Sequence, residues 1–302
     1  MPKTNLRERI GQGIILLDGA MGTQLLARGS AGGSCNEQLN LISPDVVCAV
    51  HLSYLQAGAD AILTNTFGAN KFSLARHGLD NKTSEINQAG ARLARKSAGA
   101  DKFVLGDIGP TGSLLEPLGE LKPDDCRNAF AQQAQALLAG GVDGFIIETM
   151  TSLEELTIAV EAVKSVCGDL PVLASMAFDK TEKDFRTMFG VSVEKMVAKI
   201  VPLGVDALGF NCGSASLEEY VELAKKFVSA VNQTGGNKRN VATLAEPNAG
   251  KPQLIEDRAV YTVTGEDFAV AVEKIYSAGV TIIGGCCGTS PDHIAAAARK
   301  LK

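Results

Sequence analysis

The stretch Gly140-Gly141-Val142-Asp143-Gly144-Phe145-Ile146-Ile147-Glu148 contains the unit from which the chain is built. A glycine ends a helical pattern, an aspartate follows it, and a short apolar run then ends in a polar residue. Related phrases occur at Ala57–Asp60, Leu203–Asp206 and Ala278–Val280. Glycine allows a helix to end in a left-handed residue, so that the chain turns directly into the next strand. The repeat therefore predicts successive helix–strand units.

Eight short apolar runs recur along the chain, each followed by a turn and a helical pattern. Because they are apolar throughout and do not alternate, they are typical of strands buried on both faces of a parallel sheet. Helices are expected at Asp45–Ala57, Leu153–Val166, Leu217–Val231, Asp267–Ala278 and Pro291–Leu301. The eight runs are Ile14–Leu17, Ala61–Leu63, Phe103–Leu105, Phe145–Ile147, Val172–Ala174, Ala207–Phe210, Val241–Ala245 and Val280–Ile283.

Eight strand–helix units predict an α/β protein with a single (β/α)8 barrel that occupies residues 1–302 as one domain. An open, doubly wound sheet is the competing fold. No Gly-x-Gly-x-x-Gly follows the first run, which disfavours a dinucleotide-binding version. The polar stretch Asn232–Asn240 is expected to be a surface loop. The stretch Lys180–Met188 follows the fifth run, so it is either a mobile lid at the active-site face or a solvated loop.

Charge and composition exclude several classes of function. The chain has 34 acidic and 29 basic residues and a net charge of −5, and its basic residues form no stripe, so a nucleic-acid partner is not expected. No run of about 18 apolar residues predicts a membrane span. The N-terminus is charged and lacks the apolar stretch of a signal peptide, so we expect a cytoplasmic protein.

The chain contains seven cysteines, and an odd number in a reducing compartment argues against a disulfide framework. Cys35, Cys48, Cys126 and Cys167 are scattered singly along the sequence. We interpret these four as packed or surface thiols without a catalytic role.

The other three cysteines follow predicted strands. Cys212 follows the sixth run, and Cys286 and Cys287 follow the eighth. The carboxyl ends of barrel strands share one rim, where active sites are built, and these two ends are roughly 10 Å apart because one strand separates them. Adjacent cysteines are also compatible with buried small residues or a vicinal disulfide, but the shared rim favours a metal site. The other polar residues expected at this rim are Asp18, Asn65, Asp107, Glu148, Asn211, Glu246 and Asn248.

Three thiolates around Zn²⁺ leave one tetrahedral position open, as in a catalytic zinc site. Their net charge of −1 disfavours the formation of hydroxide but suits a fourth thiolate, since zinc lowers the pKa of a thiol. Sulfur alkylation is therefore favoured over hydrolysis. Asp18 and Glu148 are candidate acceptors for an ammonium group, and the turn Gly19–Thr23 offers N–H groups and a hydroxyl to a carboxylate. Asp18 is equally compatible with a turn or helix-cap role.

Several motifs together resemble the homocysteine S-methyltransferase family, in particular the homocysteine-binding module of cobalamin-dependent methionine synthases. The resemblance covers nearly the whole chain, and the Asn-Cys and Gly-Gly-Cys-Cys-Gly motifs are its most specific part. The motifs are Asp18–Thr23, Thr64–Gly68, Gly106–Gly112, Phe210–Cys212, Glu246–Pro252 and Gly284–Pro291.

The resemblance implies a zinc enzyme that transfers a methyl group to homocysteine and so forms methionine. It implies that Cys212, Cys286 and Cys287 bind Zn²⁺ and carry the catalysis. It also implies that Asp18, Gly22, Thr23 and Glu148 contact homocysteine, and that Asn248 approaches the zinc when substrate is absent.

The resembled enzymes also have folate, cobalamin and reactivation modules, whereas residues 1–302 are expected to form the barrel alone. We therefore expect methylcobalamin to be bound by a separate corrinoid protein, as the segments Thr64–Gly68 and Gly106–Gly112 are closest to the cobalamin-dependent branch. A small donor, S-methylmethionine or betaine, and an excised fragment of a larger enzyme are the alternatives.

Two rival hypotheses belong to other classes. A non-catalytic module would sequester homocysteine or zinc and regulate a partner. A metal-dependent barrel lyase or aldolase is disfavoured, because none of the three histidines, His51, His77 and His293, ends a predicted strand.

Overall fold

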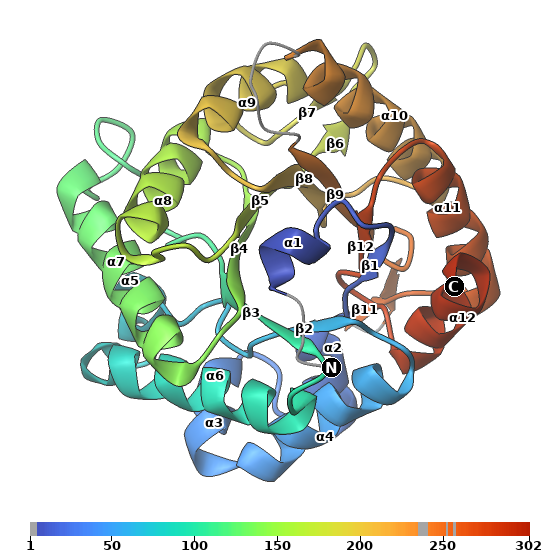
Figure 1. Ribbon diagram of the computed structural model, residues 1–302. Coiled ribbons are helices and arrows are strands. Elements are labelled where there is room, and N and C mark those ends of the chain that lie inside the picture. Colours follow the sequence, from blue (N-terminus) through green and yellow to red (C-terminus); the bar gives the residue numbers. More distant parts are fainter. Residues whose placement is uncertain (1–4, 235–240, 252, 256–257) are drawn as a thin grey trace.

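The computed structural model describes residues 5–234, 241–251, 253–255 and 258–302. Eight parallel strands form one barrel in the order β1-β12-β9-β8-β5-β4-β3-β2, surrounded by helices (Figure 1). The predicted (β/α)8 barrel is confirmed, and each of the eight apolar runs overlaps a strand. The strands are β1 Ile15–Leu16, β2 Ala61–Leu63, β3 Phe103–Ile108, β4 Gly144–Met150, β5 Val172–Met176, β8 Ala207–Asn211, β9 Ala242–Glu246 and β12 Ile282–Ile283.

All five predicted helices are present. Two have the predicted bounds, namely α8 Leu153–Val166 and α12 Pro291–Leu301. The serine expected to cap α8 does so, because the Ser152 hydroxyl accepts a hydrogen bond from the Glu155 amide at 3.3 Å. The other helices are α1 Leu6–Arg9, α2 Met21–Ala27, α3 Leu39–Ile42, α4 Pro44–Gln56, α5 Lys71–Ala75, α6 Thr83–Ala98, α7 Pro123–Gly140, α9 Val193–Ile200, α10 Leu217–Gln233 and α11 Gly265–Ser277, with 3₁₀ turns at Asn36–Gln38, Asp80–Lys82 and Val201–Leu203.

The residues of the repeated motif at the helix–strand junctions fix the register of the strands. The glycines at 58, 141, 204 and 279 have positive φ, as the repeat predicts. The Asp60 carboxylate accepts a hydrogen bond from the Leu16 amide at 3.0 Å, and the Asp60 amide donates to the Leu16 carbonyl at 2.7 Å. Asp143 and Asp206 make the same pair of bonds to the strands before them. Each aspartate thus holds its own strand in register with the preceding one.

Aspartates also join the first and last strands of the sheet order. Within the described residues, β1 and β2 form no ladder of backbone hydrogen bonds with each other. Asp60 instead binds Leu16 at one end of this strand pair. At the other end, the Leu63 amide donates to the Asp18 carboxylate at 3.1 Å. Asp18 therefore has a structural role, since it joins the carboxyl ends of β1 and β2.

Two apolar clusters stabilise the barrel. The inner one fills the barrel interior and includes Leu6 from α1, which covers the amino-terminal end near the centre of Figure 1. The outer one packs the helices on the strands. In it, Phe227 of α10 contacts Phe178 and Phe210, with ring centroids 5.5 Å away in both cases. Since Phe210 is a residue of β8, this packing fixes the strand that directly precedes Cys212.

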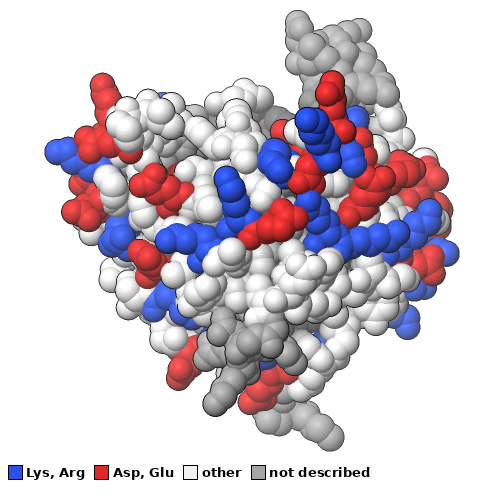
Figure 2. Space-filling view, turned by 90° about the horizontal axis from the view of Figure 1, so that it is seen from above, with Lys and Arg blue, Asp and Glu red and all other residues white. Residues whose placement is uncertain are grey.

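No helix in the described part of the chain is long and apolar enough to cross a membrane. Figure 2 shows basic and acidic side chains interspersed over one face of the molecule. This face therefore carries no region of a single sign that would attract a polyanion. The stretch predicted as a loop at Asn232–Asn240 begins within the end of α10, and its residues 235–240 lie outside the described chain.

We predict that Phe227→Ala lowers the free energy of unfolding by about 3–5 kcal/mol, because a fully buried aromatic ring is removed from a close-packed cluster. Urea unfolding followed by circular dichroism measures the change. The control Leu138→Ala removes a side chain that is 39% exposed on α7 and should change stability by less than about 1 kcal/mol. Equal effects of the two substitutions would contradict this account of the packing.

Candidate functional site

A cavity of about 400 Å³ opens at the carboxyl ends of the strands. It contains seven of the eight residues predicted for the metal and substrate sites, and Asn248 is the exception. No Lys, Arg or His lines it within the described chain, whereas five acidic residues do. The lining comprises Asp18, Gly19, Ala20, Met21, Gly22, Thr23, Asn36, Glu37, Leu63, Thr64, Asn65, Thr66, Phe67, Asp107, Glu148, Thr149, Cys212, Glu246, Gly285, Cys286 and Cys287.

Three thiols converge at one side of this cavity. Cys212 directly follows β8, while Cys286 and Cys287 follow β12, and β9 lies between these two strands. The Cys287 sulfur is 3.9 Å from that of Cys212 and 4.0 Å from that of Cys286. All three sulfurs lie within 4.8 Å of one another. The four other cysteines do not take part, because none of them lines the cavity.

This donor set fits a zinc ion. With Zn–S bonds of about 2.3 Å and tetrahedral angles, sulfur ligands are about 3.8 Å apart. The separations of the Cys287 sulfur from those of Cys212 and Cys286, 3.9 and 4.0 Å, are close to that value. Asn211 contributes a further contact, since its side-chain nitrogen is 3.7 Å from the Cys286 sulfur.

The thiols perturb each other's titration. Hydrogen bonds from Cys212 and Cys286 lower the pKa of Cys287 to about 3. Hydrogen bonds with Cys212 and Cys287, together with burial, raise the pKa of Cys286 well above its usual range. The protein groups by themselves thus stabilise one thiolate in the cluster, and a dication is the type of group that would stabilise all three.

The backbone around Cys212 is strained and held in place from several sides. Cys212 has a φ of 53°, in the left-handed region that favours glycine. The Tyr220 hydroxyl donates to the Cys212 carbonyl at 2.7 Å, and the side-chain nitrogen Nδ2 of Asn248 donates to the Gly213 carbonyl at 2.7 Å. Gly213 itself has a φ of 82°, and a Cβ there would lie 2.3 Å from the Phe178 carbonyl oxygen. These contacts aim the Cys212 side chain into the cavity.

The Cys286–Cys287 segment is attached to neighbouring strand ends. The Cys286 amide donates to the Pro247 carbonyl at 2.9 Å, and the Cys287 carbonyl accepts from the Ala249 amide at 3.0 Å. The Thr289 hydroxyl donates to the Cys286 carbonyl at 2.7 Å. These bonds link the two consecutive cysteines to the segment after β9 and fix their directions.

Four carboxyl groups line the cavity opposite or beside the thiols, and all are at least nine-tenths buried: Asp18, Asp107, Glu148 and Glu246. Burial, followed by the nearby Cys212, raises the pKa of Glu148 to about 8. Burial also raises the pKa values of Asp18, Asp107 and Glu246 well above the usual range of a carboxyl group. Without a basic side chain in the lining, these carboxyl groups form an environment that favours a cationic ligand.

The predicted substrate residues differ in their placement. Gly22 and Thr23 lie in the first turn of α2, where amide groups lack acceptors within the helix. The Thr23 hydroxyl accepts from the Gly288 amide at 3.2 Å, which connects α2 to the cysteine segment. Asn248 is buried, and its side-chain oxygen has no hydrogen-bond partner among the residues that the structure describes.

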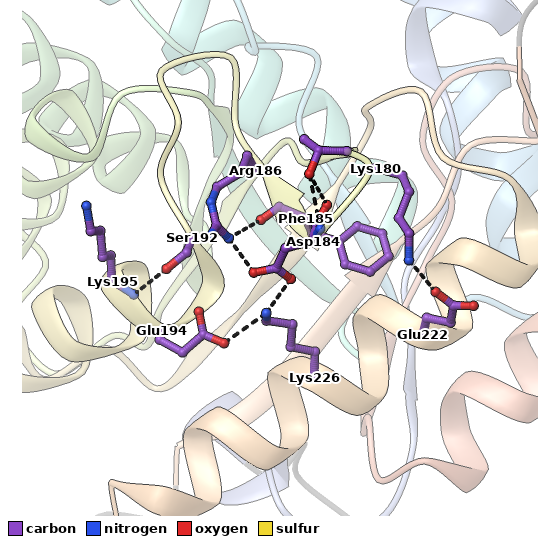
Figure 3. Close-up of polar contacts among 10 residues, drawn as sticks. Lys180, Asp184, Phe185, Arg186, Ser192, Glu194, Lys195, Glu222 and Lys226 are labelled. Carbon is purple, nitrogen blue, oxygen red and sulfur yellow. Dashed lines mark hydrogen bonds and ion pairs between the residues drawn. The ribbon is translucent and has the colours of Figure 1, made fainter.

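The polar stretch after β5 contains a two-stranded hairpin, β6 Asp179–Lys180 and β7 Phe185–Arg186. Figure 3 shows Asp184 between Arg186 and Lys226, the latter a residue of α10. The hairpin also buries Phe185, which is 3% exposed. This segment is therefore neither a simple solvated loop nor an unattached lid, because ion pairs and an apolar anchor hold it against α10.

The hairpin also contacts the loop that follows Cys212. The Asp179 carboxylate accepts hydrogen bonds from the Ser214 amide at 2.9 Å and from its hydroxyl at 2.7 Å. Asp179, Tyr220 and Thr289 were not identified from the sequence as residues of the site. Asp179 and Tyr220 support the backbone near Cys212 from other elements, so no local motif marks them. Thr289 lies within the motif Gly284–Pro291, but its bond to the Cys286 carbonyl is not evident from the sequence.

A homocysteine S-methyltransferase family model matches residues 15–301. The chain belongs to the homocysteine S-methyltransferase family. It is 33% identical to methionine synthase from Mycobacterium leprae over 96% of its own length, and 33% identical to methionine synthase from Mycobacterium tuberculosis over 99%. It spans 24% and 26% of those two proteins, about a quarter of their length.

Solved structures show the same barrel. The metallated form of the homocysteine methyltransferase MmuM from Escherichia coli matches with a TM-score of 0.79 and 24% identity, over 98% of this chain and 100% of that one. The oxidized form of the same protein matches with a TM-score of 0.75 and 25% identity, over 95% of this chain and 96% of that one. The family expected from the motifs is thus confirmed.

We predict that Gly213→Ala weakens metal retention by about tenfold or more, because the added Cβ meets the Phe178 carbonyl and strains a left-handed position. Competition with a chromogenic chelator measures the affinity. The matched control Gly32→Ala has no neighbouring atom within 4 Å and should bind metal like the wild type. Unchanged affinity in Gly213→Ala would show that this backbone geometry is not needed.

Proposed function

We propose that this protein is a zinc-dependent homocysteine S-methyltransferase that forms methionine, with methylcobalamin on a separate corrinoid protein as the methyl donor. The observation that carries the proposal is the convergence of three thiols at the wall of an acidic, amino-acid-sized cavity. Family membership supports homocysteine as the acceptor, and the 33% identity to proteins named methionine synthase supports methionine as the product. The segments Thr64–Gly68 and Gly106–Gly112, which resemble the cobalamin-dependent branch, support methylcobalamin as the donor.

Cys212, Cys286 and Cys287 would hold the zinc ion. Bound there, zinc lowers the pKa of a substrate thiol while three thiolate ligands keep the sulfur electron-rich and nucleophilic. The MmuM structure described as metallated supports a metal in this type of site.

The remaining cavity residues would bind the amino-acid part of homocysteine. Asp18 and Glu148 would accept hydrogen bonds from its ammonium group, since both line the cavity and are largely buried. Gly22 and Thr23 would bind its carboxylate through first-turn amide groups of α2. This arrangement orients the thiol towards the cysteines and leaves the open end of the cavity for the donor.

Asn248 would act on the metal side of the cavity. Its buried side-chain oxygen has no partner among the described residues, and its amide nitrogen is bound to the Gly213 carbonyl, next to Cys212. These two features support an approach of the oxygen to the zinc when homocysteine is absent.

Substitution of Cys212, Cys286 or Cys287 by alanine should release zinc and abolish methyl transfer, because two thiolates do not complete the site. Metal content by mass spectrometry and methionine formation measure the two effects. Cys48→Ala, on the outer helix α4, is the matched control and should retain both. A cysteine-cluster variant that is metal-free yet fully active would refute the mechanism.

The alternative donor class is a small molecule, S-methylmethionine or betaine. Assays with each donor and no corrinoid protein separate the hypotheses. We expect methionine with methylcobalamin on its carrier protein and none with the small donors. The reverse result would assign a small-donor enzyme, and tight homocysteine binding without transfer from any donor would assign a binding module.

A further inference from the structure

Asp107 is the acidic residue of the cavity whose side chain is least engaged with the protein. Its Oδ1 atom is buried and has no hydrogen-bond partner in the described chain. In contrast, Asp18 accepts from the Leu63 amide, and Glu148 is hydrogen-bonded to Glu246. Asp107 is only 6% exposed, and a buried carboxylate oxygen normally accepts a hydrogen bond. Its Oδ1 atom is therefore available to accept one from a ligand.

The backbone of Asp107 is fixed by two threonines of the segment after β2. Its amide donates to the Thr64 hydroxyl at 2.9 Å, and its carbonyl accepts from the Thr66 hydroxyl at 2.8 Å. The two hydroxyls are 2.5 Å apart. Because both backbone groups are satisfied, the Asp107 carboxylate is the part of the residue that is available to a ligand.

The strand order places Asp107 across the cavity from the thiols. In the barrel, β3 lies opposite β9, and the cysteines follow β8 and β12, the two neighbours of β9. Glu246, which also has an unpartnered oxygen, ends β9 itself and lies on the thiol side. A ligand that is bound at the thiols and extends across the cavity would therefore have its other end on the side of Asp107.

The charge of the cavity indicates which chemical group of the ligand would bind Asp107. The carboxyl groups of Asp18, Glu148 and Glu246 surround Asp107, and the cavity lining contains no basic side chain among the described residues. An ammonium group carries three N–H donors, and Asp18 and Glu148 supply acceptors for two of them. A third acceptor on β3 would complete its hydrogen bonding.

We infer that Asp107 binds the ammonium group of the thiol substrate and sets specificity for an α-amino thiol over the same thiol acid without the amino group. This inference rests on the proposed function, because it concerns the acceptor of that same reaction. Asp107 acts on binding and not on the metal, so its removal should leave zinc content unchanged.

The test compares two ligands on the zinc-loaded protein by calorimetry: homocysteine and 4-mercaptobutanoate, which keeps the thiol and carboxylate but lacks the ammonium group. Wild type should prefer homocysteine. In Asp107→Asn this preference should fall by about tenfold or more, as expected for the loss of a hydrogen bond to a charged group. Binding of 4-mercaptobutanoate should not weaken. Asp169→Asn, an exposed position, is the matched control and should behave like the wild type.

Asp107→Ser, which also removes the charge, gives an independent reading if Asp107→Asn alters the fold or the zinc content. An undiminished preference for homocysteine in a zinc-loaded Asp107 variant would overturn the inference while leaving the proposed function intact. Failure of the wild type to bind homocysteine would overturn both.

Discussion

Three thiol groups within 4.8 Å of one another are the constraint on which the site depends. Mutual hydrogen bonds stabilise one thiolate, at Cys287, but repulsion opposes three without a cation. The cysteines come from strands on either side of β9, so they meet only if β8, β9 and β12 stay in register. The geometry of the thiol cluster is thus coupled to the backbone pairing of β9 with its two neighbours.

Local strain at Cys212 is maintained by contacts from several elements. A left-handed backbone at a cysteine is unfavourable, and it persists where the surrounding structure determines it. Tyr220 from α10 and Asn248 after β9 bind the carbonyls of Cys212 and Gly213, and Asp179 binds Ser214. The hairpin, α10 and the segment after β9 therefore act together on one metal-ligand candidate.

The barrel could be predicted from sequence because its strands are uniformly apolar and its helix ends repeat a glycine phrase. The glycine at the end of α7 was recognised, but no residue bounds were predicted for α6 or α7. Their buried faces consist largely of small and polar residues, such as Ala91, Ala94 and Gln133. The β6–β7 hairpin was also missed, because its strands have two residues each and its attachment depends on Lys226 and Glu222, about forty residues away.

The candidate site, like the fold, could be predicted from the sequence only in part. The cysteines and rim acids follow strand ends, so their convergence follows from the fold class. The bond that Asp18 accepts from Leu63, the unpartnered oxygen of Asp107 and the bond from Tyr220 to Cys212 depend on side-chain geometry, which the sequence motifs do not encode.

X-ray absorption at the zinc edge tests the central claim most directly, because it counts the sulfur neighbours of the metal. The account predicts three sulfurs and one lighter ligand in the zinc-loaded protein, and four sulfurs at about 2.3 Å after homocysteine is added. A sulfur count that stays at three with saturating homocysteine, or a zinc ion without three cysteine sulfurs, would contradict it.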